Sequence, residues 1–72
     1  QALDSRAQAR RVTARLERFK RAEIDFDGVP DIGHAFADEL FRVFGMNHRS
    51  VELVPLNANR RILALIDNAR SG

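Results

Sequence analysis

Apolar residues recur at helical spacing near the start of the chain, at steps of three and four residues. The residues that share this spacing are Ala9, Val12, Leu16 and Phe19. Such a stripe is typical of an amphipathic helix with one buried face. Residues 5–8 read Ser-Arg-Ala-Gln, the spacing of a capping box in which the hydroxyl and the amide satisfy two free backbone donors. We therefore predict a helix that starts at Ser5 and ends near Lys20 or Arg21.

Residues 22–27 alternate strictly between apolar and acidic side chains, which predicts a strand with one buried face. Asp27-Gly28 ends this strand, and residues 29–33 form a compact loop. A second helix is predicted from about His34 to Phe44, with Gly45 as its left-handed C-cap. The residues of this helix at core spacing are Phe36, Ala37, Leu40, Phe41 and Phe44.

The last third of the chain predicts a short apolar strand over residues 51–56, which Pro55 brings to an end, and a final helix capped by Asn57. The residues of that helix expected to face inward are Ile62, Leu65, Ile66 and Ala69. A strand, helix, strand order implies a right-handed crossover between two parallel strands. The fold class is therefore a small α/β domain. Because two strands make a poor sheet, we expect further strands from an upstream part of the chain or from a second copy.

The length of 72 residues predicts a single domain over residues 1–72. The chain has no Cys, which excludes disulfides and thiolate metal sites and fits a cytoplasmic protein. No apolar run approaches the roughly 20 residues needed to cross a bilayer, so we expect no membrane partner. Because the chain begins with Gln, we expect it to be the C-terminal piece of a longer one.

Charge is distributed unevenly along the chain. Residues 1–21 hold seven basic against two acidic side chains, a net charge of +5, whereas residues 22–72 hold five Arg against eight acidic side chains, a net charge of −3. Arg11, Arg15 and Arg18 would line up on one flank of the first helix and could follow nucleic-acid phosphates. Against this alternative, the chain has no Tyr or Trp for base stacking, and all five Phe fall at core spacing.

Few residues are arranged for chemistry. Asp25, Asp27 and Asp31 could bind a cation, but turn formation accounts for the two aspartates of the loop, and Asp25 should pair with an Arg or a backbone donor. His34 and Asp38 have a spacing that metals can use, yet no third ligand accompanies them, and Asp38 should instead pair with Arg42. Nucleotide-binding and nucleophile motifs are absent. We expect no enzyme and no catalytic, cofactor or metal site.

Four segments resemble a bacterial family of STAS-like domains of unknown function. They read S-R-A-Q-A at residues 5–9, E-I-D-F-D-G-V at 23–29, I-G-H-A-F-A-D-E-L-F at 32–41 and L-N-A-N at 56–59. The F-A-D-E-L-F run after the I-D-F-x-G-V strand is the most specific of these. Family members usually carry at least one strand before the S-R-x-Q helix, which agrees with a missing upstream segment.

The resemblance implies a non-catalytic regulatory or protein-interaction module in bacterial signalling. In the related anti-sigma-factor antagonists, a partner kinase with a histidine-kinase-like ATPase fold phosphorylates a Ser at a helix start. That position falls on His34 here, so the serine switch does not carry over. The resemblance still implies a protein partner, such as a histidine-kinase-like ATPase domain, and we also expect self-association. The expected contact residues, at the helix start and the preceding loop, are Asp31, Gly33, His34, Ala35 and Asp38.

Overall fold

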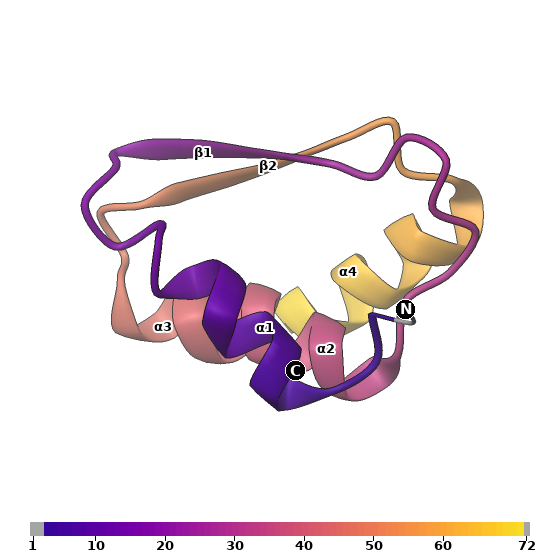
Figure 1. The fold of residues 1–72 in the computed structure, drawn as a ribbon, viewed down its shortest axis with the longest axis horizontal. Helices are drawn as coiled ribbons and strands as arrows, with labels where there is room; N and C mark the ends of the chain where they lie inside the picture. The colour runs from indigo at the N-terminus through magenta and orange to yellow at the C-terminus, as the bar shows by residue number, and fades with distance from the viewer. Residues whose placement is uncertain (1–2, 72) are drawn as a thin grey trace.

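Two parallel strands form one layer of the domain, and all of the helices lie on the same side of it (Figure 1). The structure, a computed structural model, describes residues 3–71. Strand β1 (Arg21–Asp25) pairs with β2 (Glu52–Leu56), in a register that runs from Arg21 opposite Glu52 to Asp25 opposite Leu56. The helical elements are α1 (Arg6–Thr13), α2 (His34–Asp38), the π-helical segment η1 (Glu39–Val43), α3 (Phe44–Asn47) and α4 (Arg60–Ser71). The α/β class and the parallel pair are confirmed, and within residues 3–71 the sheet has no third strand.

The core lies between the sheet and the helices. Ala22 and Leu53 sit opposite each other on the buried face of the two strands, and Phe26 follows β1 into the same layer. Each helix contributes at least one buried apolar side chain to this core, although Ala9 is the one fully buried residue of the stripe predicted for the first helix. The large side chains that are most completely buried are Phe26, Leu40, Ile62 and Ile66.

Helix α1 begins as predicted and ends early. Ser5 accepts a hydrogen bond from the backbone N–H of Gln8, and the Gln8 side chain accepts one from the backbone of Ser5, so the capping box is present. The helix ends at Thr13, not near Lys20 or Arg21, and tight turns follow in residues 14–18. The prediction of a longer helix was wrong because the chain must leave the helix layer and reach the sheet before β1 starts. As a consequence, Phe19 is 52% exposed and lies outside the core.

The second helix starts at His34 as predicted but continues past Gly45 to Asn47. Gly45 does not adopt a left-handed conformation, so its predicted role as C-cap was wrong, and His48 is the C-cap instead. The π-helical segment in its middle was also not predicted. A π-helical segment inserts one extra residue into a helix, yet all five residues predicted to face the core are buried.

Two further details differ from the sequence prediction. Pairing continues past Pro55, since the N–H of Phe26 donates to the carbonyl of Leu56 at 2.8 Å. Proline is tolerated there because its missing N–H would point to the outer edge of the sheet. The cap of α4 is Asn59, whose side-chain oxygen accepts from the N–H of Ile62 at 2.9 Å. Asn57, the predicted cap, adopts a left-handed conformation with φ of 56°.

Candidate functional site

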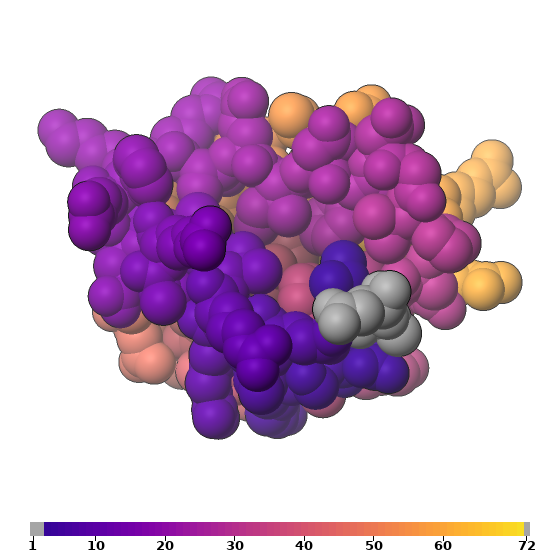
Figure 2. Space-filling view, viewed as in Figure 1, coloured from indigo at the N-terminus to yellow at the C-terminus, as the bar shows by residue number. Residues whose placement is uncertain are grey.

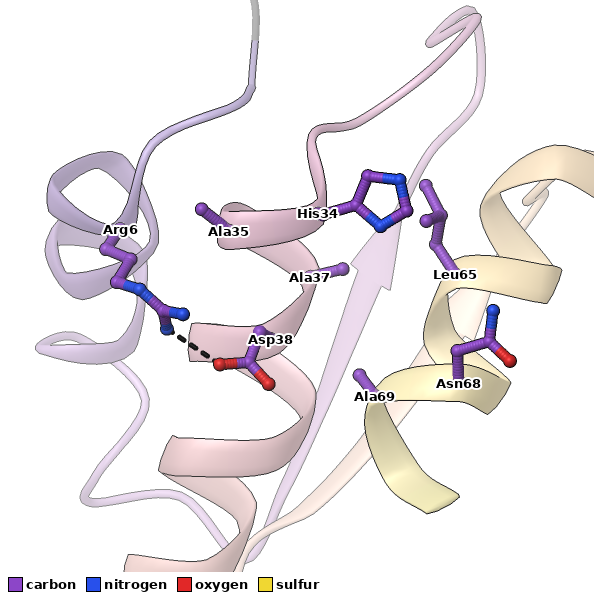
Figure 3. A pocket seen from close by; sticks show the side chains of 8 residues that line it. All are labelled: Arg6, His34, Ala35, Ala37, Asp38, Leu65, Asn68 and Ala69. Carbon is purple, nitrogen blue, oxygen red and sulfur yellow. Dashed lines mark hydrogen bonds and ion pairs between the residues drawn. The ribbon is translucent and has the colours of Figure 1, made fainter. Parts of the chain in front are cut away.

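A groove of about 550 Å³ crosses the exposed side of α2, between α1 and α4 (Figure 3). Figure 3 shows Arg6 of α1 on one side, with Leu65, Asn68 and Ala69 of α4 on the other. His34 and Ala37 point toward α4, whereas Ala35 points toward α1. The lining therefore combines alanine and leucine side chains with a cation, a carboxylate, an imidazole and an amide.

The groove continues toward the start of α2. A second hollow of about 410 Å³ shares His34, Leu65 and Asn68 with the first, and it adds Asp31 and Gly33. The five contact residues expected from the sequence therefore all line one continuous surface, which we call the α2–α4 groove. Their shared location follows from the fold, because α4 packs beside α2 and closes the second wall.

Asp38 is the most strongly perturbed acid along this groove. Its carboxylate accepts hydrogen bonds from both Nε and Nη2 of Arg42, and from Nη1 of Arg6 at 2.8 Å. The predicted pair with Arg42 is confirmed. These bonds, first from Arg42 and then from Arg6, hold the pKa of Asp38 well below its usual range and raise the pKa values of both guanidinium groups. A carboxylate held ionised in this way is unsuited to accepting or donating a proton near neutral pH.

Glu39 extends the same network into the π-helical segment. It is only 8% exposed, and its carboxylate lies 3.4 Å from Nη1 of Arg6 and 3.7 Å from Nε of Arg10. Two arginines of α1 thus reach two neighbouring acids on the second helix. The network ties α1 to α2 and fixes the wall of the groove that Arg6 forms.

Position 33 requires glycine because the backbone of Asp4 passes close to it. A Cβ on Gly33 would lie 2.6 Å from the Cα of Asp4, closer than such atoms come in proteins. The N–H of Gly33 donates to the carbonyl of Leu3 at 2.8 Å. The start of α2 is therefore partly covered by the segment that leads into α1, and the N–H of Gly33 is already engaged in a hydrogen bond.

A family model described as a STAS-like domain of unknown function matches residues 8–62. The chain belongs to this family. The matched segment runs from α1 to the first turn of α4, so it holds both strands and the whole of the second helix. Comparison with curated proteins and with solved structures found no match. None of the helices within residues 3–71 has the length and hydropathy needed to cross a bilayer.

Asp25, another acid singled out from the sequence, supports the turn that follows β1. Asp25 accepts from the N–H of Asp27 at 2.9 Å and from the side-chain amide of Asn57 at 3.0 Å. The bond from Asn57 is the main reason that the pKa of Asp25 is lowered. The predicted backbone donor is confirmed and the predicted Arg is not. Within residues 3–71, no group of three or more potential ligands is placed to hold a metal ion.

The basic residues singled out from the sequence lie elsewhere on the domain. Arg11 and Arg15 flank a shallow hollow of about 360 Å³ whose apolar lining comes from Val12 and Leu16. Because α1 ends at Thr13, Arg18 lies beyond the helix, and the straight row of three guanidinium groups is interrupted. All three arginines are exposed.

Sequence reasoning missed Arg6 and Asn68 as parts of the α2–α4 groove. Arg6 stood out only as one of many cations, and its spacing to Asp38 in the chain carries no signal. Asn68 lies beside the inward apolar stripe of α4. The spacing of apolar residues identifies that stripe, but it does not identify a groove next to it.

Proposed function

We propose that this STAS-like domain is a non-catalytic protein-interaction module with a regulatory role, and that the α2–α4 groove is its contact surface. The observation that carries this proposal is the convergence of five expected contact residues on one groove. Its lining has the character of a protein interface, with apolar residues at the centre and polar side chains around them.

The chemistry of the groove supports binding over catalysis. Asp38 is held ionised by hydrogen bonds from two arginines, which makes it a poor general acid or base near neutral pH. His34 is the first residue of α2. A regulatory switch of the serine-phosphorylation kind is therefore not part of the proposal. The expected partner is a protein such as a histidine-kinase-like ATPase domain.

Site-specific photo-crosslinking in living cells tests the proposal, because it captures whichever protein occupies the groove. A photoreactive residue replaces Asn68 in the groove or, as a matched control, Asn47 at the exposed end of α3. We expect a discrete crosslinked species from position 68 only, and we expect the groove substitution Ala35→Arg to remove it. No crosslinked protein at position 68, or equal yields at both positions, would contradict this function.

Nucleic-acid binding is the second candidate function, and one observation favours it. Phe19 is exposed and follows Arg15 and Arg18 closely in the chain, so an aromatic side chain for base stacking accompanies the cations after all. Fluorescence anisotropy with labelled single-stranded DNA and RNA tests it. Binding should weaken steeply as the salt concentration rises. Replacing Arg11, Arg15 and Arg18 by alanine should reduce the slope of log affinity against log salt concentration by about 2. Binding that a Phe19→Ala variant retains at full strength would argue against stacking.

A further inference from the structure

Arginines outnumber carboxylates in the ion network along the α1 side of the α2–α4 groove. The members of this network are Arg6 and Arg10 of α1, Arg42 of the second helix, and the acids Asp38 and Glu39. Three guanidinium groups thus surround two carboxylates, and one positive charge remains in excess. A negative charge from outside the network would compensate it.

The two signs of charge differ in their access to solvent. The side chains of Asp38 and Glu39 are 24% and 11% exposed. The side chains of Arg6, Arg10 and Arg42, which we call the arginine rim, are 44%, 67% and 37% exposed. Figure 2 shows α1, in indigo, at the surface of the viewed face. A molecule that approaches this side of the groove therefore meets guanidinium groups, which favours an anionic partner.

The arginine rim also has hydrogen-bond donors to spare. Among residues 3–71, Arg6 donates only through Nη1, to Asp38 and Glu39. Arg10 approaches Glu39 through Nε at 3.7 Å, which is too long for a hydrogen bond. A guanidinium group has five N–H donors in a planar fork that can bind a carboxylate through two of them. Nη2 of Arg6 and the terminal nitrogens of Arg10 have no acceptor among residues 3–71, so they can bind a carboxylate of a partner.

The part of the groove next to the arginine rim is apolar. Ala37 and Ala69 line it from α2 and α4, and Leu65 of α4 is half-buried there. Because alanine side chains fill little space, the groove of about 550 Å³ has room for a large apolar side chain of a partner. Grooves with apolar walls are surfaces on which proteins bind the apolar face of an amphipathic helix.

We infer that the partner segment in the α2–α4 groove is an acidic amphipathic helix. Its apolar side chains pack on Leu65 and the two alanines, and a glutamate or aspartate on its flank binds the arginine rim. The wall formed by α4 presents Arg61 and no carboxylate, so it does not repel such a helix. This inference rests on the proposed function, because it names the chemistry of the partner.

Fluorescence anisotropy of the 72-residue chain with two labelled peptides tests the inference. One peptide has leucine on one face of a helix and glutamate on its flanks, and its twin has glutamine in place of each glutamate. We expect the glutamate peptide to bind at least about tenfold more tightly at low salt, and this preference should shrink as the salt concentration rises.

A single-charge variant tests the role of the arginine rim. Arg10→Gln should weaken binding of the glutamate peptide about two- to fivefold, because one exposed ion pair is lost, and it should leave binding of the glutamine peptide unchanged. Arg49→Gln, an equal charge change in the exposed turn before β2, should leave both affinities unchanged. Circular dichroism confirms that each variant is folded. Crosslinking of the glutamate peptide from a photoreactive residue at position 68, but not at position 47, would place it in the groove.

Several outcomes would overturn the inference. They are absence of binding, equal binding of the two peptides, full-strength binding by Arg10→Gln, and equal crosslinking from both positions. Single-stranded DNA that displaces the glutamate peptide as readily as unlabelled peptide does would also overturn it, because the arginine rim would then bind any polyanion. The proposed function would still stand in each case if position 68 captures a protein in cells.

Discussion

Phe36 and Phe19 are the same residue type in opposite environments, and replacing each with alanine tests the packing of the domain. Phe36 is 2% exposed in the core, whereas Phe19 is 52% exposed beyond the end of α1. Truncating a buried Phe costs about 3–5 kcal/mol, because the transfer free energy of the ring is lost and a cavity remains. A domain of 72 residues has a total stability of roughly 4–11 kcal/mol. Phe36→Ala therefore removes a large part of that stability.

Thermal unfolding followed by circular dichroism measures the effect. Phe36→Ala should lower Tm by at least about 12 °C, at roughly 4 °C or more for each kcal/mol in a domain of this size. Phe19→Ala is a surface substitution and should change the free energy of unfolding by about 0.5 kcal/mol or less. Similar melting of Phe36→Ala and the parent would refute the placement of α2. An equally large loss in Phe19→Ala would refute the early end of α1.

Three more predictions concern the helix glycines, one carboxylate and one helix cap. Gly33→Ala should lower the free energy of unfolding, measured in urea, by about 1–3 kcal/mol, because its Cβ would collide with Asp4. Gly45→Ala should raise the free energy of unfolding by about 0.5–1 kcal/mol, because a Cβ there meets no other atom and alanine favours the helix. Asp38 has a lowered pKa in the folded state, so its contribution to stability is present above the unfolded pKa of about 3.9 and is lost as pH falls through the lower folded value. Asp38→Asn should therefore be less stable at pH 7 and show a flatter decline of stability below about pH 4. Asn59→Ala should cost about 1 kcal/mol and speed amide hydrogen exchange at Ile62, whereas unchanged exchange would contradict its role as the cap of α4.

Local rules explain what sequence reasoning predicted well. The capping box at Ser5, the alternation over residues 22–27 and the start of the second helix each depend on neighbours within a few positions. The core positions of the second helix were also predicted, because an apolar stripe must be buried somewhere. In α4 three of the four predicted inward residues are buried, whereas Leu65 is half-buried and lines the groove. The parallel pairing then followed from the order of the elements.

The sequence predictions were wrong at positions where contacts between distant segments determine the local conformation. Phe19 continued an apolar stripe, yet the chain had to leave the helix layer to reach β1, and this ended α1 before Phe19 could be buried. Gly45 has the residue type of a C-cap, but the helix continues through it to Asn47. Pro55 is a strand breaker within a sheet and was tolerated because it lies on an edge.

In the candidate site, too, some features follow from the local sequence and others from contacts between distant segments. The contact residues around the start of α2 were predicted from the chain, and their type and spacing follow from the sequence alone. The second wall of the α2–α4 groove comes from α4, about 30 residues further along the chain, and its Asn68 has no local signal. Arg6 reaches Asp38 across 32 positions, so the ion network depends on how α1 packs against α2.

The sequence by itself determined the α/β class, the elements and their buried faces, since capping, periodicity and turn chemistry act over a few residues. Only the tertiary structure decided which residues share the groove and where α1 ends. These features depend on contacts between segments far apart in the chain, and packing of the whole core selects among local patterns that are each acceptable.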